Sequence, residues 1–244
     1  MFKFMTPSQL VRMAARLQPI AGAVAAGAIA IGLYYALVNS PPDYQQGQAV
    51  RIMYMHVPFA WLATMVYGIM AIFSLVGLIW RHPLAHLACR AAAPLGAVFT
   101  GLCLVTGSIW GKPMWGTWWV WDARLSSVLV LFFVYLGYLA LVRAFESPEK
   151  GERLAAILVV VGSVNLPIIK FSVEWWNSLH QPASVLRLGK PTIDGTILIP
   201  LLLLVVGFMG LFVYLWLMNL RSAVIERRLL NFALNERAEA KERS

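Results

Sequence analysis

Charged side chains are scarce in this sequence. Asp, Glu, Lys and Arg make up 13% of its 244 residues, against roughly 25% in soluble domains, and hydrophobic residues make up 60%, against roughly 45–50%. A soluble globular fold is therefore not expected. Cutting the chain at every charged residue leaves six long uncharged runs, 17–42, 52–80, 91–111, 125–142, 154–169 and 195–220.

The sequence also has few cysteines and no nucleotide-binding motif. The two cysteines, Cys89 and Cys103, fall beside or within the third run, so the sequence predicts neither an outer-face disulfide nor a CxxC redox site. No Walker motif occurs, so any ATP that supports the protein's function would be hydrolysed by another subunit. No repeat or composition break marks a second domain.

Most of the six runs match the roughly 20 apolar residues that cross a bilayer core as a helix. Lys170 can extend the short fifth run by placing its ammonium group at the membrane interface. Continuous apolar runs favour helices over a barrel. We therefore predict an all-α integral membrane protein, one six-transmembrane-helix bundle over residues 1–244 with an uncleaved first helix. The expected spans are about 18–38, 53–80, 91–110, 125–143, 154–171 and 195–219, followed by a tail over 220–244.

Lysines and arginines divide unevenly between the two predicted faces. With the N-terminus inside, fourteen of the 20 lie on the inner face and six on the outer face. The positive-inside rule then places both termini in the cytoplasm. The net charge of +9 needs no nucleic acid to explain it, because anionic membrane lipid attracts the basic residues on the inner face.

Tryptophan is concentrated in the predicted outer connections. Seven of the ten tryptophans lie in 110–121 or at 175–176, mostly beside or within a loop expected over 111–124. An aromatic belt at the interface would explain tryptophans shared among several helices. This density is confined to one segment bounded by Gly and Pro, which favours a platform of aromatic planes for an apolar ligand. The residues concerned are Trp110, Trp115, Trp118, Trp119 and Trp121.

Two of the four histidines are expected on the same outer face. His56 lies near the outer end of the second span and His180 in the loop before the sixth, whereas His82 and His86 fall in an inner loop. The sequence leaves two roles open for His56 and His180, packing within the bundle and binding of a ligand. Two imidazoles suit an iron whose other four positions a planar macrocycle fills, whereas zinc would need further protein ligands.

Soft sulfur ligands are a second possibility for the outer face. The methionines concerned, Met53, Met55 and Met114, more often serve packing.

Charged residues near the tryptophan segment could hold an anionic ligand. Arg51, Lys112 and Arg124 are among the few outer cations, and an arginine can bind a carboxylate through two hydrogen bonds. Each could equally serve as an interfacial anchor or pair with an acidic neighbour. We expect Asp122 to orient the loop through backbone amides.

Three segments resemble one known family. WGKPMWGTWWVWDARLSS (110–127) is similar to the tryptophan-rich WWD signature of membrane proteins that handle haem, and SVEWWNSLHQ (172–181) with RIMYMHVP (51–58) resembles the CcmC family in particular. The resemblance covers nearly the whole chain. It implies a haem exporter component of cytochrome c maturation, a multi-pass protein of the bacterial inner membrane whose tryptophan-rich loop faces the periplasm.

The resemblance also implies a ligand and a site. Haem b (iron protoporphyrin IX) would lie on Trp115, Trp118, Trp119 and Trp121, with His56 and His180 as axial ligands of its iron. Asp122 and the arginines Arg51 and Arg124 would complete the site. Larger cytochrome c synthetase relatives carry more spans and additional histidines, so two outer histidines favour haem presentation over final ligation to apocytochrome.

The family's partners are the haem chaperone CcmE, to which haem would be presented for covalent attachment, and the CcmA, CcmB and CcmD subunits of an ABC-type complex. The chain itself is then not an enzyme. Two alternatives stay open. One is a haem lyase acting directly on CxxCH thiols, for which loops this short offer no apocytochrome groove. The other is a permease subunit, which would carry polar residues deep within its spans.

Overall fold

The computed structural model describes residues 6–181, 184–185 and 189–242. Lys3, Arg187 and Arg243, which entered the charge comparison, lie outside them. Within the described residues the chain is helical apart from its connections and an isolated bridge between Asp43 and Gly47. The helices are α1 (Pro7–Tyr34), the π-helical turn η1 (Tyr35–Asn39), α2 (Val50–Trp80), α3 (Pro83–Trp115), α4 (Ala123–Arg143), α5 (Pro148–Gly162), α6 (Asn165–Trp175) and α7 (Gly195–Glu242).

Six helical segments are long and apolar enough to cross a membrane, which confirms the predicted six-helix membrane bundle. The first segment joins α1 to η1, and the fifth joins α5 to α6. Pro167 explains why the fifth segment is broken. It has no amide proton to donate to the carbonyl of Ser163, so the α-helical ladder ends at Gly162 and restarts at Asn165.

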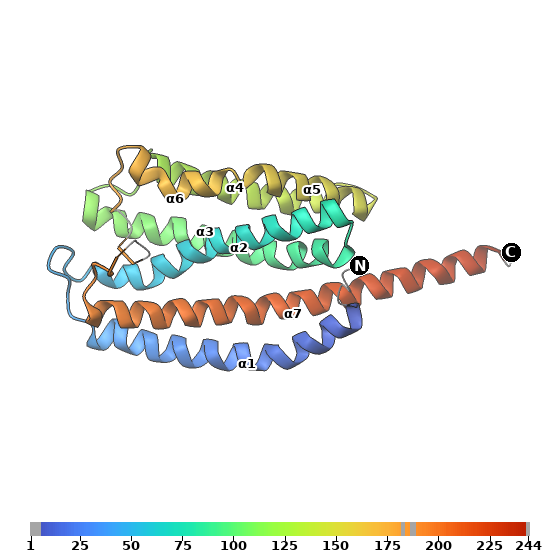
Figure 1. Cartoon of the computed structure of the whole chain (residues 1–244), viewed down its shortest axis with the longest axis horizontal. Helices are drawn as coiled ribbons and strands as arrows, with labels where there is room; N and C mark the ends of the chain where they lie inside the picture. The colour runs from blue at the N-terminus through green and yellow to red at the C-terminus, as the bar shows by residue number, and fades with distance from the viewer. Residues whose placement is uncertain (1–5, 182–183, 186–188, 243–244) are drawn as a thin grey trace.

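The helices lie roughly parallel or antiparallel, with α1 and α7 along one edge, α2 and α3 in the middle, and α4, α5 and α6 along the other edge (Figure 1). Both ends of the chain lie at the same end of the bundle, and α7 continues well beyond it. The connections 40–49 and 116–122 and the described part of 176–194 meet at the opposite end. The tryptophan segment and His180 therefore lie at the end away from the termini.

Two buried tyrosines fix α2 at the centre of the bundle. The hydroxyl of Tyr67 on α2 donates to the carbonyl of Val159 at 3.0 Å, and that of Tyr135 on α4 donates to the carbonyl of Ala63 at 2.8 Å. Their rings meet edge to face, with centroids 5.3 Å apart. Because polar groups in a bilayer need partners within the protein, these bonds tie α2 to α4 and α5. The helix that carries His56 is thus held on two sides.

At the end near the termini, α7 is joined to α5 by ion pairs. Arg227 lies 3.4 Å from the carboxylate of Glu152 and 3.5 Å from that of Glu149. Glu152 is buried, whereas Glu149 is exposed. This contact is far from the tryptophan segment and anchors α7 where it leaves the bundle.

Candidate functional site

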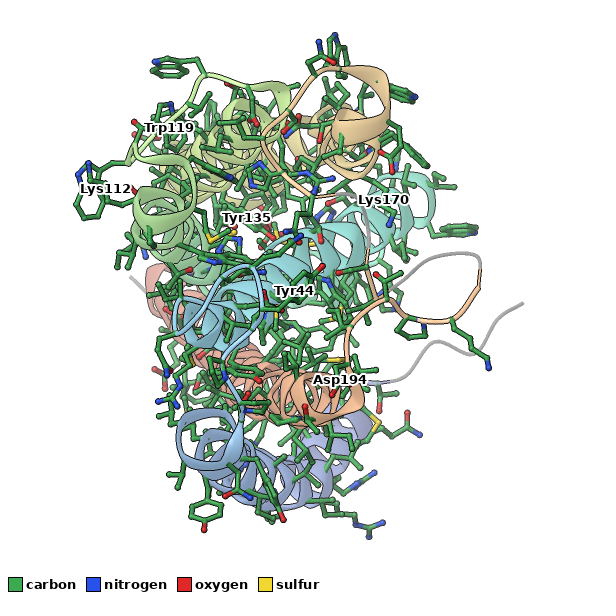
Figure 2. All side chains as sticks on the ribbon, turned by 90° about the vertical axis from the view of Figure 1, so that its left-hand side faces the viewer. Tyr44, Lys112, Trp119, Tyr135, Lys170 and Asp194 are labelled. Carbon is green, nitrogen blue, oxygen red and sulfur yellow. The ribbon has the colours of Figure 1, made fainter. Side chains whose placement is uncertain are left out.

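A cavity of about 1500 Å³ occupies the end of the bundle where the outer connections meet. Its walls come from α2, α3, α4, α6 and α7, from the connection 40–49 and from the described part of 176–194. Figure 2 looks onto this end, with Trp119 and Lys170 on opposite sides of the bundle. Five predicted site residues line the cavity: His56, Trp115, Trp119, Arg124 and His180. Four do not: Arg51, Trp118, Trp121 and Asp122.

His56 reaches the cavity from the outer end of α2. Pro58, two residues later, leaves the carbonyl of Tyr54 without its usual helical donor. Across the cavity wall, Gly107 of α3 lets the imidazole lie close, because a Cβ at that position would come within 2.9 Å of His56 Cε1. Any larger residue at 107 would force the ring to move. A glycine on α3 therefore helps to set the position of His56.

One hydrogen bond sets the tautomer of His56. Its Nδ1 lies 3.1 Å from Oγ1 of Thr106, whose own hydroxyl proton is donated to the carbonyl of Leu102 at 2.7 Å. Since that oxygen already uses its proton, it accepts from His56, and Nδ1 carries the ring proton. With the ring proton on Nδ1, Nε2 keeps its lone pair.

His180 follows the same pattern with a stronger acceptor. Its Nδ1 lies 3.3 Å from Oδ2 of Asp122, and its backbone amide donates to Ser178 Oγ at 3.1 Å. Burial lowers the pKa of the imidazole, with Arg124 acting in the same direction against the opposing charge of Asp122. The neutral ring is therefore favoured near neutral pH. Its proton lies on Nδ1, facing the carboxylate, and Nε2 keeps a lone pair for a ligand.

Asp122 serves two structural elements at once. Oδ1 accepts the amide of Leu125 at 2.7 Å and caps the N-terminus of α4, while Oδ2 accepts the hydroxyl of Ser178 at 2.5 Å. Burial alone would raise the pKa of the carboxyl, but the bonds from Ser178 and Leu125, together with His180, lower it below its usual value. The carboxylate therefore stays charged beside His180. The expectation that Asp122 binds backbone amides covers one of these two roles.

Two tryptophans pack against the two histidines. The ring of Trp110 meets His56 edge to face with centroids 5.5 Å apart, and Trp115 meets His180 in the same manner at 4.8 Å. Trp110 Nε1 donates to the side-chain oxygen of Gln46 at 3.1 Å, which connects α3 to the first outer connection. Each imidazole thus has an aromatic neighbour that also lines the cavity.

The other tryptophans of the segment divide by exposure. Trp119 lines the cavity, and its Nε1 is buried without a hydrogen-bond partner among the described residues. Trp118 is 57% exposed and Trp121 is 78% exposed. Trp121 packs edge to face against Trp119, with centroids 5.5 Å apart. The segment therefore presents one aromatic surface inward to the cavity and another outward.

The three predicted cations occupy different environments. Arg124 lines the cavity and donates from Nε to Ser172 Oγ at 3.1 Å and from a terminal nitrogen to the carbonyl of Lys170 at 3.4 Å. Arg51 has a buried Nε without a partner among the described residues. Lys112 donates to the carbonyl of Gly116 at 3.0 Å, so it closes the turn after α3. Of the three, only Arg124 lines the cavity, so it is the best placed for an anionic group.

Two imidazoles with free Nε2 lone pairs on one cavity suit the two axial positions of a haem iron. Within the described residues no cluster of three or more His, Cys, Asp and Glu side chains could hold a metal ion. The unpartnered donor of Trp119, the cation of Arg124 and the largely apolar lining also fit a large, flat ligand with anionic substituents. The residues present thus fit haem, with Nε2 of His56 and His180 as the candidate ligand atoms.

Several contributors to this site were not predicted from the sequence. The sequence predicts Trp110 only as part of the aromatic platform, and it gives no prediction for Thr106, Gly107 or Ser178. A Ser two residues before His180 was visible in the sequence as part of a hydrogen-bonding turn. The pairing of Thr106 and Gly107 with His56 had no local signal, because 50 or more residues separate them.

Comparison with known proteins identifies the family of this chain. The family model of heme exporter protein C (CcmC) matches residues 1–234. The chain is 54% identical to heme exporter protein C of Bradyrhizobium diazoefficiens over 222 residues, which is 91% of this chain and 84% of that protein. It is 48% identical to heme exporter protein C of Escherichia coli K12 over 197 residues, which is 81% of this chain and 79% of that protein.

A more distant relative is the cytochrome c biosynthesis ccmC-like mitochondrial protein of Marchantia polymorpha, which is 45% identical over 196 residues, 80% of this chain and 83% of that protein. The matches cover most of this chain and most of each relative. The family resemblance inferred from the tryptophan segment and the two histidine segments is therefore confirmed. With six membrane-spanning segments and matches of this extent, the chain belongs to the heme exporter protein C (CcmC) family.

Proposed function

We propose that this protein binds haem b at the periplasmic face of the bacterial inner membrane and presents it for covalent attachment to the haem chaperone CcmE during cytochrome c maturation. It would do so within a complex with CcmA, CcmB and CcmD. His56 and His180 supply the axial ligands of the iron, and this chain carries out no catalytic step itself. The positive-inside distribution of lysine and arginine supports the assignment of the site to the periplasmic face.

One observation carries the proposal: both outer histidines line one cavity, and the Nδ1 of each faces an acceptor, which leaves the lone pair on Nε2. Thr106 accepts from His56, and Asp122 accepts from His180. In metal sites such second partners fix the ring orientation and raise the basicity of the ligating nitrogen. An ordinary packing histidine needs no such arrangement, and finding it twice around one cavity favours a ligand between the two rings.

The aromatic and cationic residues have complementary roles in this proposal. Trp115 and Trp119 contact the macrocycle inside the cavity, and Arg124, which lines the same cavity, is the candidate partner of a propionate. Trp118 and Trp121 stand at the exposed side of the same platform. Exposed apolar side chains rimmed by polar groups are typical of binding surfaces, so this side is where the chaperone would approach the haem.

The test uses the purified protein in detergent, loaded with haem b. Absorption spectra of the oxidised and reduced forms would be recorded for the parent and for His56→Ala and His180→Ala. His82→Ala, at the other end of the bundle, is the matched control. We expect a six-coordinate spectrum in the parent and the control, and loss of that spectrum in both site variants, because each removes one axial ligand.

The second arm measures covalent transfer of haem to the soluble domain of CcmE on a haem-stained denaturing gel. We expect transfer with the parent and the control and little with either site variant. If both site variants kept the parent's spectrum and its transfer, the ligand assignment would be wrong. Holocytochrome formed without the chaperone would instead establish the lyase alternative.

A further inference from the structure

The cavity is larger than the proposed haem site requires. Ligand pockets usually measure about 300–1000 Å³, and this cavity measures about 1500 Å³. The residues around the two histidines come from α2, α3 and α4 and from the connections. Further lining residues lie along α2 and α7 and run inward from the outer ends of these helices. We call this second part of the cavity the α2–α7 slot, lined by Val57, Trp61, Thr64, Met65, Ile197, Leu201, Val205 and Met209.

The slot runs along one face of α7. Its lining residues on this helix, Ile197, Leu201, Val205 and Met209, recur every fourth position and so share a face. Twelve residues at 1.5 Å per residue correspond to roughly 18 Å along the helix. Because a bilayer core is roughly 30 Å thick, the slot reaches about the middle of the membrane. A haem held only at the interface would not need such depth.

The deep end of the slot meets the membrane. Met209 is 41% exposed, although Val205, one turn earlier, is buried. Because α7 is long and apolar enough to span the membrane, an exposed apolar side chain at this position would face lipid. The polar group of Thr64 in the slot is satisfied within α2, since its hydroxyl donates to the carbonyls of Ala60 and Trp61. The slot therefore offers an apolar path that is continuous with the histidines and open to the bilayer.

A cation stands at the outer end of this path. Lys170 on α6 lines the same cavity and lies on the side of the bundle where the described part of the connection before α7 runs (Figure 2). Its carbonyl is held by Arg124, whereas its ammonium group makes no hydrogen bond or ion pair with any residue that the structure describes. An apolar slot ending at a cation near the interface matches a flat, amphipathic anion such as haem, whose propionates would stay near the surface.

We propose that the α2–α7 slot is a lateral entry through which haem passes from the outer leaflet of the bilayer to the site between His56 and His180, with Lys170 guiding its propionates. This inference rests on the proposed haem-binding function, which it extends by assigning the source of the haem. Its occupant is haem, and a phospholipid acyl chain is the alternative occupant that the experiment distinguishes.

The test compares haem uptake by the full-length protein in phosphatidylcholine liposomes that already contain dissolved haem b. The rate at which the haem spectrum of the site appears would be measured for the parent, Met209→Trp and Lys170→Gln. Met218→Trp is the matched control, because Met218 lies on the same helix, is 39% exposed and does not line the cavity. Lys170→Arg is the conservative variant.

We expect Met209→Trp to slow uptake at least tenfold while the final spectrum and occupancy equal those of the parent. Lys170→Gln should slow uptake severalfold, and Lys170→Arg and Met218→Trp should keep the parent's rate. Equal rates in the parent and Met209→Trp would overturn the entry role and leave the haem site standing. A lower final occupancy in Met209→Trp would also overturn it, because Met209 would then belong to the binding site.

Mass spectrometry of the intact protein separates the two occupants. A phospholipid that is lost in Met209→Trp without any change in haem uptake would identify an acyl chain in the slot and overturn the proposal. A parent that takes up no haem, or whose haem spectrum is unchanged by His56→Ala and His180→Ala, would overturn the proposed function and this inference together. Both outcomes are distinct from an equal uptake rate in the parent and Met209→Trp, which would overturn the entry role alone.

Discussion

Oδ2 of Asp122 lies 3.3 Å from Nδ1 of His180 and joins two segments that are 58 residues apart in the chain. The same oxygen accepts the hydroxyl of Ser178, and the other carboxylate oxygen caps α4. The tryptophan segment and the connection after α6 are thus linked through one side chain. Any movement of the tryptophan segment would be transmitted to the proposed ligand His180.

Replacing Asp122 by Asn should weaken haem binding without unfolding α4. Asn caps a helix about as well as Asp, but it removes the charge that holds the Nδ1 proton of His180. Loss of such a second partner usually costs about 10–100-fold in metal affinity, and we expect a loss in that range for haem. Spectral titration measures the affinity.

Asp122→Ala is the matched comparison, since it removes the helix cap as well. It should lose haem affinity to the same extent and also lower the thermal midpoint, by an amount that corresponds to about 1 kcal/mol. Unchanged haem affinity in both variants would show that the contact between Asp122 and His180 does not support ligation.

The stability of the protein without haem should depend on pH through His180. Because burial lowers its pKa below the usual histidine value of about 6.5, the unfolded chain binds a proton at this residue at a higher pH than the folded chain. Stability should therefore fall as the pH drops below 6.5 and level off below the pKa of the folded state. Thermal midpoints measured between pH 7.5 and 5 would give this profile.

His180→Gln should flatten the His180 part of that profile, because Gln does not titrate. Asp122→Asn should shift that part to lower pH, because the charge of Asp122 raises the pKa of His180. NMR of imidazole-labelled protein would follow the ring directly. A His180 that titrates above its usual value would contradict the environment described here.

A methyl group at position 107 should disturb His56. The Cβ of Gly107→Ala would lie 2.9 Å from His56 Cε1, closer than real Cβ contacts, so the ring or α3 must move. We expect a changed haem spectrum and a loss of affinity of at least fivefold, measured by titration.

Gly101→Ala is the control for this change, because its Cβ would meet only Phe132, at an ordinary 3.4 Å. That variant should keep the haem spectrum and could gain up to about 1 kcal/mol from the better helix propensity of Ala. Equal behaviour of the two variants would mean that Gly107 has no part in placing His56.

The ion pair at the end near the termini should matter for stability and not for haem. Arg227→Ala leaves Glu152, which is 4% exposed, as an unpaired buried carboxylate, and breaking buried pairs in this way costs about 3–5 kcal/mol. We expect a clear drop in the thermal midpoint with an unchanged haem spectrum.

Arg90→Ala offers a surface comparison, because it breaks a pair with Glu226 in which both side chains are exposed. Such pairs contribute less than about 1 kcal/mol, so its thermal midpoint should barely change. A similar drop in both variants would contradict the distinction between the buried and the exposed pair.

The tryptophans of the 110–121 segment show what the sequence could predict about the site and what it could not. Their density near one connection was enough to predict a platform, and the WWD pattern was enough to recognise the family. Which indole faces the cavity was not predictable, because Trp118 and Trp119 are adjacent in the chain and differ only in how the turn after Gly116 directs them. Gly116 adopts a φ of +77°, which ends α3 and sets that direction.

The sequence by itself determined that this protein is a six-helix membrane bundle, because crossing a bilayer requires long uncharged runs and their length is a local property of the chain. It also identified His56 and His180 as the outer histidines. Only the tertiary structure decided that both line one cavity, that Thr106 and Asp122 hold their Nδ1 protons, and that the cavity extends between α2 and α7. These are contacts between side chains far apart in the sequence, and they arise from how the helices pack, which no local pattern specifies.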